Sequence, residues 1–203
     1  MTTFTGKKPS EWTTTTKAAV KEAIDIGDRH RDSFGTLSTV LQGGSTWTNR
    51  LLRSTKVSAP HIAKNDYFAY KCQFNHDKKL LTNLDGFHVH IIPVGAVSGG
   101  EVIHMTYAWG WLKNGDTYPD TLPNTGQCTI TLSAGDQFKY LIKGLVSNMA
   151  YPTSEGYSSE LFIEFHRSND GNDTYSGEFA LVDGDAHYLT NRTGSKYEYS
   201  DTP

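Results

Sequence analysis

Residues 67–74 read Tyr-Phe-Ala-Tyr-Lys-Cys-Gln-Phe, and an apolar side chain occupies every second position from Phe68 to Phe74. Successive side chains of a β-strand point to opposite faces, so the side chains of Phe68, Tyr70, Cys72 and Phe74 share one face. Alternation with a period of two is typical of a strand that covers a core on one side. The stretch therefore predicts a half-buried β-strand within a β-rich fold.

The same alternation recurs toward the C-terminus, and turn residues such as Gly, Asn and Asp separate its occurrences. About seven or eight strands at this spacing, with little helix, predict a mainly β fold, an antiparallel β-sandwich. A jelly roll is the preferred topology, and a closed barrel is left open. Further strands are expected at residues 87–94, 102–111, 127–132, 137–145 (with Phe138, Tyr140 and Ile142), 160–166 and 178–189, the last interrupted by Gly184.

The segment 1–60 follows a different pattern. Residues 16–26 place apolar side chains near a helical period and precede Gly27, which predicts one short helix. Beyond it, large apolar residues are spread among Gly, Ser, Thr and charged residues. We therefore expect residues 1–60 to be a partly helical N-terminal arm that makes assembly contacts, and residues 61–203 to be the β-sandwich body. The alternative is a long irregular lead that wraps around its own domain.

Composition restricts the class of protein. The chain has 203 residues, a formal net charge of −3, 20% charged residues and 36% hydrophobic residues. Without a strong basic field, direct binding to nucleic acid is not expected. No apolar run approaches the roughly 18 residues that a membrane-spanning helix needs, and residues 1–9 lack the apolar core of a signal peptide. We expect synthesis in a reducing cytoplasm, with Cys72 and Cys128 as buried free thiols.

The sharpest local feature is the pair His88 and His90 in an expected strand. Residues two apart in a strand point the same way, so the two imidazoles would lie side by side, as metal ligands do. A third ligand could come from His104 or His187. Metal-binding cupins use such a pair, but the acid that their pattern places shortly after the second His is absent. The alternative is a pair that packs in a half-buried sheet face, and we expect neither a metal nor a cofactor.

Carboxylate pairs and aromatic residues allow weaker hypotheses. Asp183 with Asp185, and Glu160 with Glu164, could share a face, but their spacing does not single out an acid and a nucleophile. We therefore expect no catalytic residue and no enzymatic activity. A platform for sugar stacking is conceivable, although aromatic side chains at this period also fit a sandwich core or an oligomer interface; the residues concerned are Tyr107, Trp109, Trp111 and Tyr118.

Several short motifs follow one another in a fixed order between residues 66 and 199. An acidic turn precedes His-Val-His, a Gly-X-Val strand leads to Tyr-X-Trp, an Arg precedes Asp-Thr-Tyr-X-Gly, and Asp-X-His-Tyr precedes Gly-Ser-Lys. The residues are Asp85, His88, Val89, His90, Gly100, Val102, Tyr107, Trp109, Arg167, Asp173, Thr174, Tyr175, Gly177, Asp185, His187, Tyr188, Gly194, Ser195, Lys196 and Glu198. In this order the chain resembles a family of small virion structural proteins of tailed bacteriophages. It departs at Ile91, where the family has Trp, and at Thr106, where it has Glu.

The resemblance implies a non-enzymatic assembly protein with a β-sandwich body. It would belong to the head, as decoration or fibre, or to the neck or tail connector, after synthesis in the cytoplasm of the bacterial host. The expected partners are further copies of the chain, in a homo-oligomer, and capsid, portal or tail proteins, with no membrane contact. Large apolar residues are typical interface anchors, so we expect contacts at Trp12, Phe34, Trp47, Tyr107 and Trp109.

Two other functions remain as alternatives. The first is a carbohydrate-binding β-sandwich module for host recognition, which would use the aromatic residues. The second is a cupin-like metal-dependent enzyme, which would use His88, His90 and His187.

Overall fold

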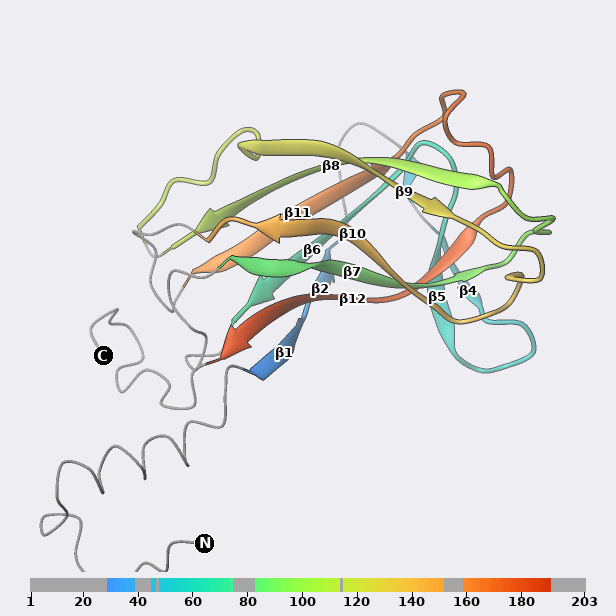
Figure 1. Ribbon diagram of the computed structural model, residues 1–203, viewed down its shortest axis with the longest axis horizontal. Coiled ribbons are helices and arrows are strands. Elements are labelled where there is room, and N and C mark those ends of the chain that lie inside the picture. The colour runs from blue at the N-terminus through green and yellow to red at the C-terminus, as the bar shows by residue number, and fades with distance from the viewer. Residues whose placement is uncertain are drawn as a thin grey trace, which may run out of the picture.

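The computed structural model describes residues 29–38, 45–46, 48–74, 83–113, 115–151 and 159–190. These residues form two stacked β-sheets, antiparallel except for one short parallel pair (Figure 1). The predicted β-sandwich is therefore confirmed. The helix expected at residues 16–26 lies outside the described residues. Within the described ranges, no helix has the length and hydropathy needed to cross a membrane.

Sheet A has the strand order β10-β7-β12-β5-β4, with β1 also beside β12, and sheet B has the order β2-β6-β11-β8-β9, with β3 beside β6. The strands of sheet A are β1 (Arg29–Phe34), β4 (Thr48–Leu51), β5 (Ser58–Ile62), β7 (Leu84–Pro93), β10 (Leu141–Met149) and β12 (Phe179–Thr190). Those of sheet B are β2 (Thr36–Ser38), β3 (Ser45–Thr46), β6 (Asp66–Gln73), β8 (Val102–Leu112), β9 (Asn124–Thr131) and β11 (Glu160–Arg167).

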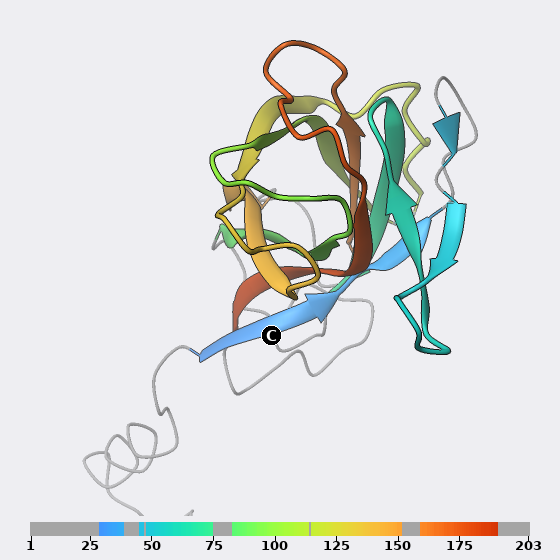
Figure 2. The same cartoon turned by 90° about the vertical axis from the view of Figure 1, so that its right-hand side faces the viewer.

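The pairing of strands β5 to β12 is that of a jelly roll. β5 pairs with β12, β6 with β11, β7 with β10 and β8 with β9, and every pair is antiparallel. β5, the first of these strands, thus lies beside β12, the last, and successive pairs belong alternately to sheet A and sheet B. Figure 2 looks along the sandwich and shows the strands surrounding the core. The preferred topology is confirmed, and the two sheets remain separate instead of closing into one barrel.

The described part of the segment 1–60 belongs to the two sheets of its own chain. β1 pairs with β12 along its whole length, and beyond Gly35 the chain continues as β2 beside β6. A Cβ at Gly35 would lie 2.8 Å from Cδ1 of Tyr70, so the backbone passes close to this ring where it changes sheets. This arrangement corresponds to the alternative in which the lead wraps around its own domain. An assembly role for the rest of the segment stays a prediction.

The core between the sheets is rich in aromatic side chains. Phe68 and Phe165 are fully buried, and their rings stack with centroids 5.0 Å apart. The ring of Phe179 meets that of Phe68 edge-on at 6.3 Å. Cys72 and Cys128 are buried free thiols, as expected, and burial raises the pKa of each to about 12. Both thiols are therefore protonated at neutral pH and behave as small core side chains.

The strand expected at residues 137–145 is displaced along the chain, because β10 begins at Leu141. Phe138 adopts a φ of 61°, which is incompatible with an extended strand at this position. The alternating residues that predicted the strand are exposed: Phe138 by 41%, Tyr140 by 53% and Ile142 by 59%. Leu141 packs against the core instead. The inward-facing positions are thus shifted by one residue from the predicted alternation.

Gly184 does not interrupt the last strand as expected. β12 continues through it, with a shift in its register against β7 between Leu181 and Asp183. A Cβ at Gly184 would lie 2.6 Å from Cζ of Tyr70, so the missing side chain makes room for this buried ring. The glycine therefore serves the packing between the two sheets.

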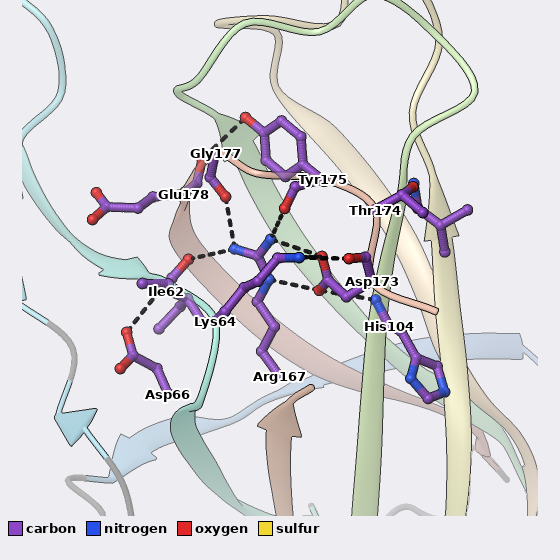
Figure 3. Close-up of polar contacts among 12 residues, drawn as sticks. Ile62, Lys64, Asp66, His104, Arg167, Asp173, Thr174, Tyr175, Gly177 and Glu178 are labelled. Carbon is purple, nitrogen blue, oxygen red and sulfur yellow. Dashed lines mark hydrogen bonds and ion pairs between the residues drawn. The ribbon is translucent and has the colours of Figure 1, made fainter. Parts of the chain in front are cut away.

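Arg167, the last residue of β11, is fully buried at the centre of a polar network (Figure 3). Its Nε and Nη2 donate to the two carboxylate oxygens of Asp173 at 2.9 and 3.1 Å. Further N–H groups donate to the carbonyl oxygens of Ile62, Tyr175 and Gly177. These bonds offset the cost of burying a guanidinium, because each of its five N–H groups finds an acceptor. The network fixes the loop that leads from β11 to β12.

Candidate functional site

A cluster of polar side chains lies on the outer face of sheet A, across β7 and β12, which run side by side in Figure 1. In β7 the side chains of Phe87, Val89 and Ile91 are fully buried in the core. His88 and His90 therefore point to the opposite, outer face, as their spacing predicts. In the antiparallel register Asp185 lies opposite His88. The fold thus brings an acid from β12 beside the histidine pair.

The contacts within this cluster are short. Nε2 of His187 lies 3.1 Å from Nδ1 of His88 and 2.9 Å from Oδ2 of Asp185. The other carboxylate oxygen of Asp185, Oδ1, lies 2.9 Å from Nε2 of His90. The carboxylate of Asp185 therefore bridges the imidazoles of His90 and His187, and the imidazole of His88 adjoins that of His187.

Tyr140, which precedes β10, extends the cluster. Its hydroxyl lies 2.5 Å from Nδ1 of His90, and the two rings meet edge-on. When the hydroxyl donates to Nδ1, the proton of the neutral imidazole is on Nε2, which faces Asp185. This contact holds the ring of His90 in its orientation.

The cluster is closed at its centre and open at its side. The side chain of Asp185 is 2% exposed, that of His90 is 15% exposed and that of His187 is 32% exposed. A buried carboxylate requires positive or hydrogen-bonding partners, because an isolated charge is costly to remove from water. Nitrogen and carboxylate oxygen donors of His88, Asp185 and His187 lie within 4.8 Å of one another, which is close enough to ligate a single metal ion. The cluster can therefore hold a cation or relay a proton.

The structure brings together part of the residues that the sequence singled out. His187 joins His88 as predicted, whereas His104 lies in sheet B with its Nδ1 3.3 Å from Oδ2 of Asp170. Asp183, the expected partner of Asp185, accepts a hydrogen bond from the N–H of Gly184. Glu160 and Glu164 lie on β11 in the other sheet.

Sequence reasoning missed the part that Asp185 and Tyr140 take in the cluster. Asp185 and His187 are two residues apart in a strand, the same spacing as His88 and His90, so this signal was present. No local signal points to Tyr140, because its contact with His90 spans 50 residues.

The aromatic residues proposed as a sugar platform do not lie together on the surface. Trp109 is 9% exposed and belongs to the core, against which Tyr107 also packs. The ring of Trp111 contacts the ring of Tyr151, and its Nε1 donates to the carbonyl of Ala150. Tyr118 is 64% exposed. Trp109 thus lies in the core of a single chain, whereas Tyr107 packs against that core and also lines a groove on sheet B. Contacts of either residue with other subunits stay predictions.

The remaining interface predictions fall on residues of which less is known. Trp12 and Trp47 lie outside the described residues. The backbone of Phe34 ends β1 and pairs with Asp185 of β12. Contacts of these three residues with other subunits stay predictions.

A groove of about 410 Å³ crosses the outer face of sheet B. One row across the strands is formed by Tyr67, His166, Thr106 and Gln127, and the next row by Ala69, Glu164, Ala108 and Thr125. In the second row, Ala69, Ala108 and Thr125 have small side chains, which leave a hollow beside the rings of the first row. The rings of Tyr67 and His166 stack with centroids 4.1 Å apart and an interplanar angle of 17°.

Partial loss of contact with water alters the titration of two groove residues. It raises the pKa of the Glu164 carboxyl and lowers the pKa of the His166 imidazole. Both shifts favour the neutral forms. The groove therefore combines a flat ring surface with several hydrogen-bonding groups.

The chain matches no family model, and the search of curated proteins found no match. Among solved structures, that of TmCBM61 in complex with beta-1,4-galactotriose aligns with 80% of this chain and 88% of its own, at 8% sequence identity. The TM-score of this alignment is 0.24, a value at which the similarity supports no inference about fold or ligand.

Proposed function

We propose that the protein is a non-enzymatic structural component of a tailed-bacteriophage virion, either on the head as decoration or fibre or in the neck or tail connector. The proposal rests on the resemblance between residues 66–199 and small phage virion proteins. The observation that carries it furthest is that two motifs of this resemblance, far apart in the sequence, meet in one cluster of the fold, while a third forms a cluster within one short stretch of chain.

The first cluster is the Arg167 network. Arg167, Asp173, Tyr175 and Gly177 all belong to motifs of the resemblance, and Arg167 donates hydrogen bonds to each of the other three. A Cβ at Gly177 would lie 2.5 Å from the Tyr175 hydroxyl, so this position requires glycine. Residues that form such buried contacts stabilise the fold, which is the role expected of them in a structural protein.

The second cluster is the polar cluster on sheet A. It joins the His-Val-His motif of β7 to the Asp-X-His-Tyr motif of β12 through Asp185. The two motifs are therefore parts of one arrangement, as expected if the resemblance extends to the three-dimensional structure.

The surface of sheet A offers area for assembly. β10 stands at the end of its strand order, so one side of this strand is unpaired among the described strands. Exposed apolar side chains lie at or just before the start of this strand: Phe138, Tyr140 and Ile142. Edge strands and exposed apolar groups are common sites of association between subunits. A repeated subunit in a particle can use such an edge around a rotation axis.

Immunogold labelling of gradient-purified phage particles tests this proposal. An antibody raised against the folded chain is expected to label one defined part of the particle. The proposal fails if the antibody detects the protein in the lysate but leaves purified, intact and partly disassembled particles unlabelled.

The groove on sheet B favours a second candidate, a carbohydrate-binding module that recognises the host surface. Flat rings such as Tyr67 suit the apolar face of a sugar, and groups such as Glu164 and Gln127 can bond to its hydroxyls. A carbohydrate function and a structural one are compatible if the chain lies at an exposed tip of the particle.

A glycan array probed with the full chain tests the second candidate. Binding to a defined set of glycans that is lost in Tyr67→Ala and retained in Tyr118→Ala would support it. Tyr118 is a suitable control because it is exposed and does not line the groove. Absence of binding, or equal binding by both variants, would reject a site in this groove.

A further inference from the structure

We propose that His88, Asp185 and His187 bind one divalent transition-metal ion on the outer face of sheet A, and that this ion links β7 to β12. The inference does not depend on the proposed virion function, because it rests on the geometry of these three side chains. It also differs from the set His88, His90 and His187 considered from the sequence, since Asp185 takes the place of His90.

Distances between the donor atoms support a shared ion. With metal–nitrogen and metal–oxygen bonds of about 2.0–2.2 Å, two ligands at a right angle are about 3 Å apart, and two tetrahedral ligands are about 3.4 Å apart. Nε2 of His187 lies 3.1 Å from Nδ1 of His88 and 2.9 Å from Oδ2 of Asp185. Both separations fit neighbouring positions around one ion.

Hydrogen bonding alone explains this arrangement less well. The Nε2 atom of a neutral imidazole either carries the ring's one proton or offers a lone pair. Nε2 of His187 nevertheless lies next to both Nδ1 of His88 and Oδ2 of Asp185. In addition, the side chain of Asp185 is only 2% exposed, so water contributes little to balancing its charge. A cation would balance the charge of this carboxylate and accept the lone pairs that converge on it.

The residues around the three ligands are arranged as supports. Nε2 of His90 lies 2.9 Å from Oδ1 of Asp185, the carboxylate oxygen that faces away from His187. The hydroxyl of Tyr140 holds Nδ1 of His90 in turn. Ligating carboxylates in metalloproteins are commonly oriented by such outer contacts. His90 and Tyr140 are therefore positioning residues for Asp185.

The donor set selects the class of metal. Two imidazoles and one carboxylate suit zinc, iron(II) and related transition metals, whereas calcium and magnesium prefer oxygen ligands. Because the His187 side chain is 32% exposed, solvent or a group of a neighbouring subunit can complete the coordination. An ion bound to two neighbouring strands cross-links them and stabilises the outer face of sheet A.

Metal content of the full-length chain provides the test. The purified protein is stripped with EDTA, mixed with an equimolar amount of Zn²⁺ and passed through a desalting column before metal analysis. We expect about one ion per chain in the wild type and less than about a tenth of that in His187→Ala. The control His166→Ala, a half-buried histidine of sheet B, should bind as the wild type does.

Two further measurements keep the test informative if a variant is poorly folded. Asp185→Asn preserves the shape of the side chain and should also lose the ion, with circular dichroism reporting on its fold. X-ray absorption of the Zn²⁺-loaded wild type should show a first shell of nitrogen and oxygen that includes imidazole. The inference is overturned if the wild type retains no ion, or if folded His187→Ala and Asp185→Asn both retain as much as the wild type.

Discussion

Nδ1 of His88 lies 3.1 Å from Nε2 of His187, although 99 positions separate the two residues in the chain. The contact exists because β7 and β12 are neighbours in sheet A, with Asp185 opposite His88 in the register. A jelly roll places strands that are far apart in the sequence side by side, so two short histidine motifs become one cluster. The topology therefore determines what the side chains of this cluster can do.

Replacing His90 by Ala should weaken the binding of Zn²⁺ by about 10- to 100-fold without abolishing it. The reason is that His90 contacts the carboxylate of Asp185 and does not itself belong to the three proposed ligands. Titration calorimetry of the EDTA-stripped chain measures the change. Unaltered affinity would show that His90 does not orient Asp185, and complete loss would make His90 a ligand.

Replacing Asp173 by Ala should lower the free energy of unfolding by about 3–5 kcal/mol, because it leaves the buried charge of Arg167 without its partner. Replacing Arg50 by Ala removes an ion pair with Glu178 in which the Arg50 side chain is 53% exposed, and should cost less than about 1 kcal/mol. Urea unfolding of both variants provides the comparison. Equal effects of the two substitutions would contradict the structural importance of the buried pair.

The stabilising effect of Glu101 should depend on pH. Hydrogen bonds from Ser98, above all from its side chain, and from the N–H of Gly99 lower the pKa of Glu101 to about 2 from its ordinary value of 4.5. A lowered pKa in the folded state gives stabilisation that is present above pH 4.5 and is lost as the pH falls toward 2. The difference in unfolding midpoint between wild type and Glu101→Gln should therefore shrink over this interval.

Circular dichroism melts at a series of pH values measure this difference. In Ser98→Ala the side-chain hydrogen bond is missing, so the pKa of Glu101 in the folded state should lie closer to 4.5, and the loss of stabilisation should be smaller and complete at a higher pH. A difference between wild type and Glu101→Gln that stays constant from pH 7 to pH 2 would contradict the assignment.

Two truncations should separate the proposed assembly contact from the fold. Deleting residues 1–28 leaves every described strand in place, and the chain should unfold cooperatively as before. Deleting residues 1–60 removes β1 to β4 and part of β5, so β12 and β6 lose their outer neighbours and the sandwich should be strongly destabilised. Thermal unfolding distinguishes the two.

The shorter truncation also tests the arm. If residues 1–28, which include Trp12, provide an assembly contact, their removal should reduce the mass of the oligomer measured by light scattering. An oligomer of unchanged mass would locate the contact elsewhere, for instance on the edge strand β10.

Local patterns predicted the central strands because burial on one face leaves a direct trace in the sequence. β6 is predicted almost completely, since Phe68, Tyr70 and Cys72 all face the core. The prediction at residues 137–145 was displaced because Phe138 and Ile142 are apolar but exposed, and alternation alone does not reveal which face is buried.

Contacts between distant residues were beyond the reach of local patterns. The sequence indicated that His88 and His90 share a face, but the partner strand with Asp185 depends on the jelly-roll topology. The pairing of Arg167 with Asp173 spans only six positions, but it is set by a loop whose path no periodicity describes. The strands β1 and β4 escaped prediction because polar residues predominate in them and they join the sheets at their margins.

The central claim is that this chain is a structural part of a phage particle, and quantitative mass spectrometry of gradient-purified particles tests it most directly. Peptides of the chain should be recovered at a constant ratio to the major capsid protein across the particle peak and in repeated preparations. A chain that is expressed in infected cells but absent from the particle peak, or present there at a ratio that varies between preparations, would contradict the claim.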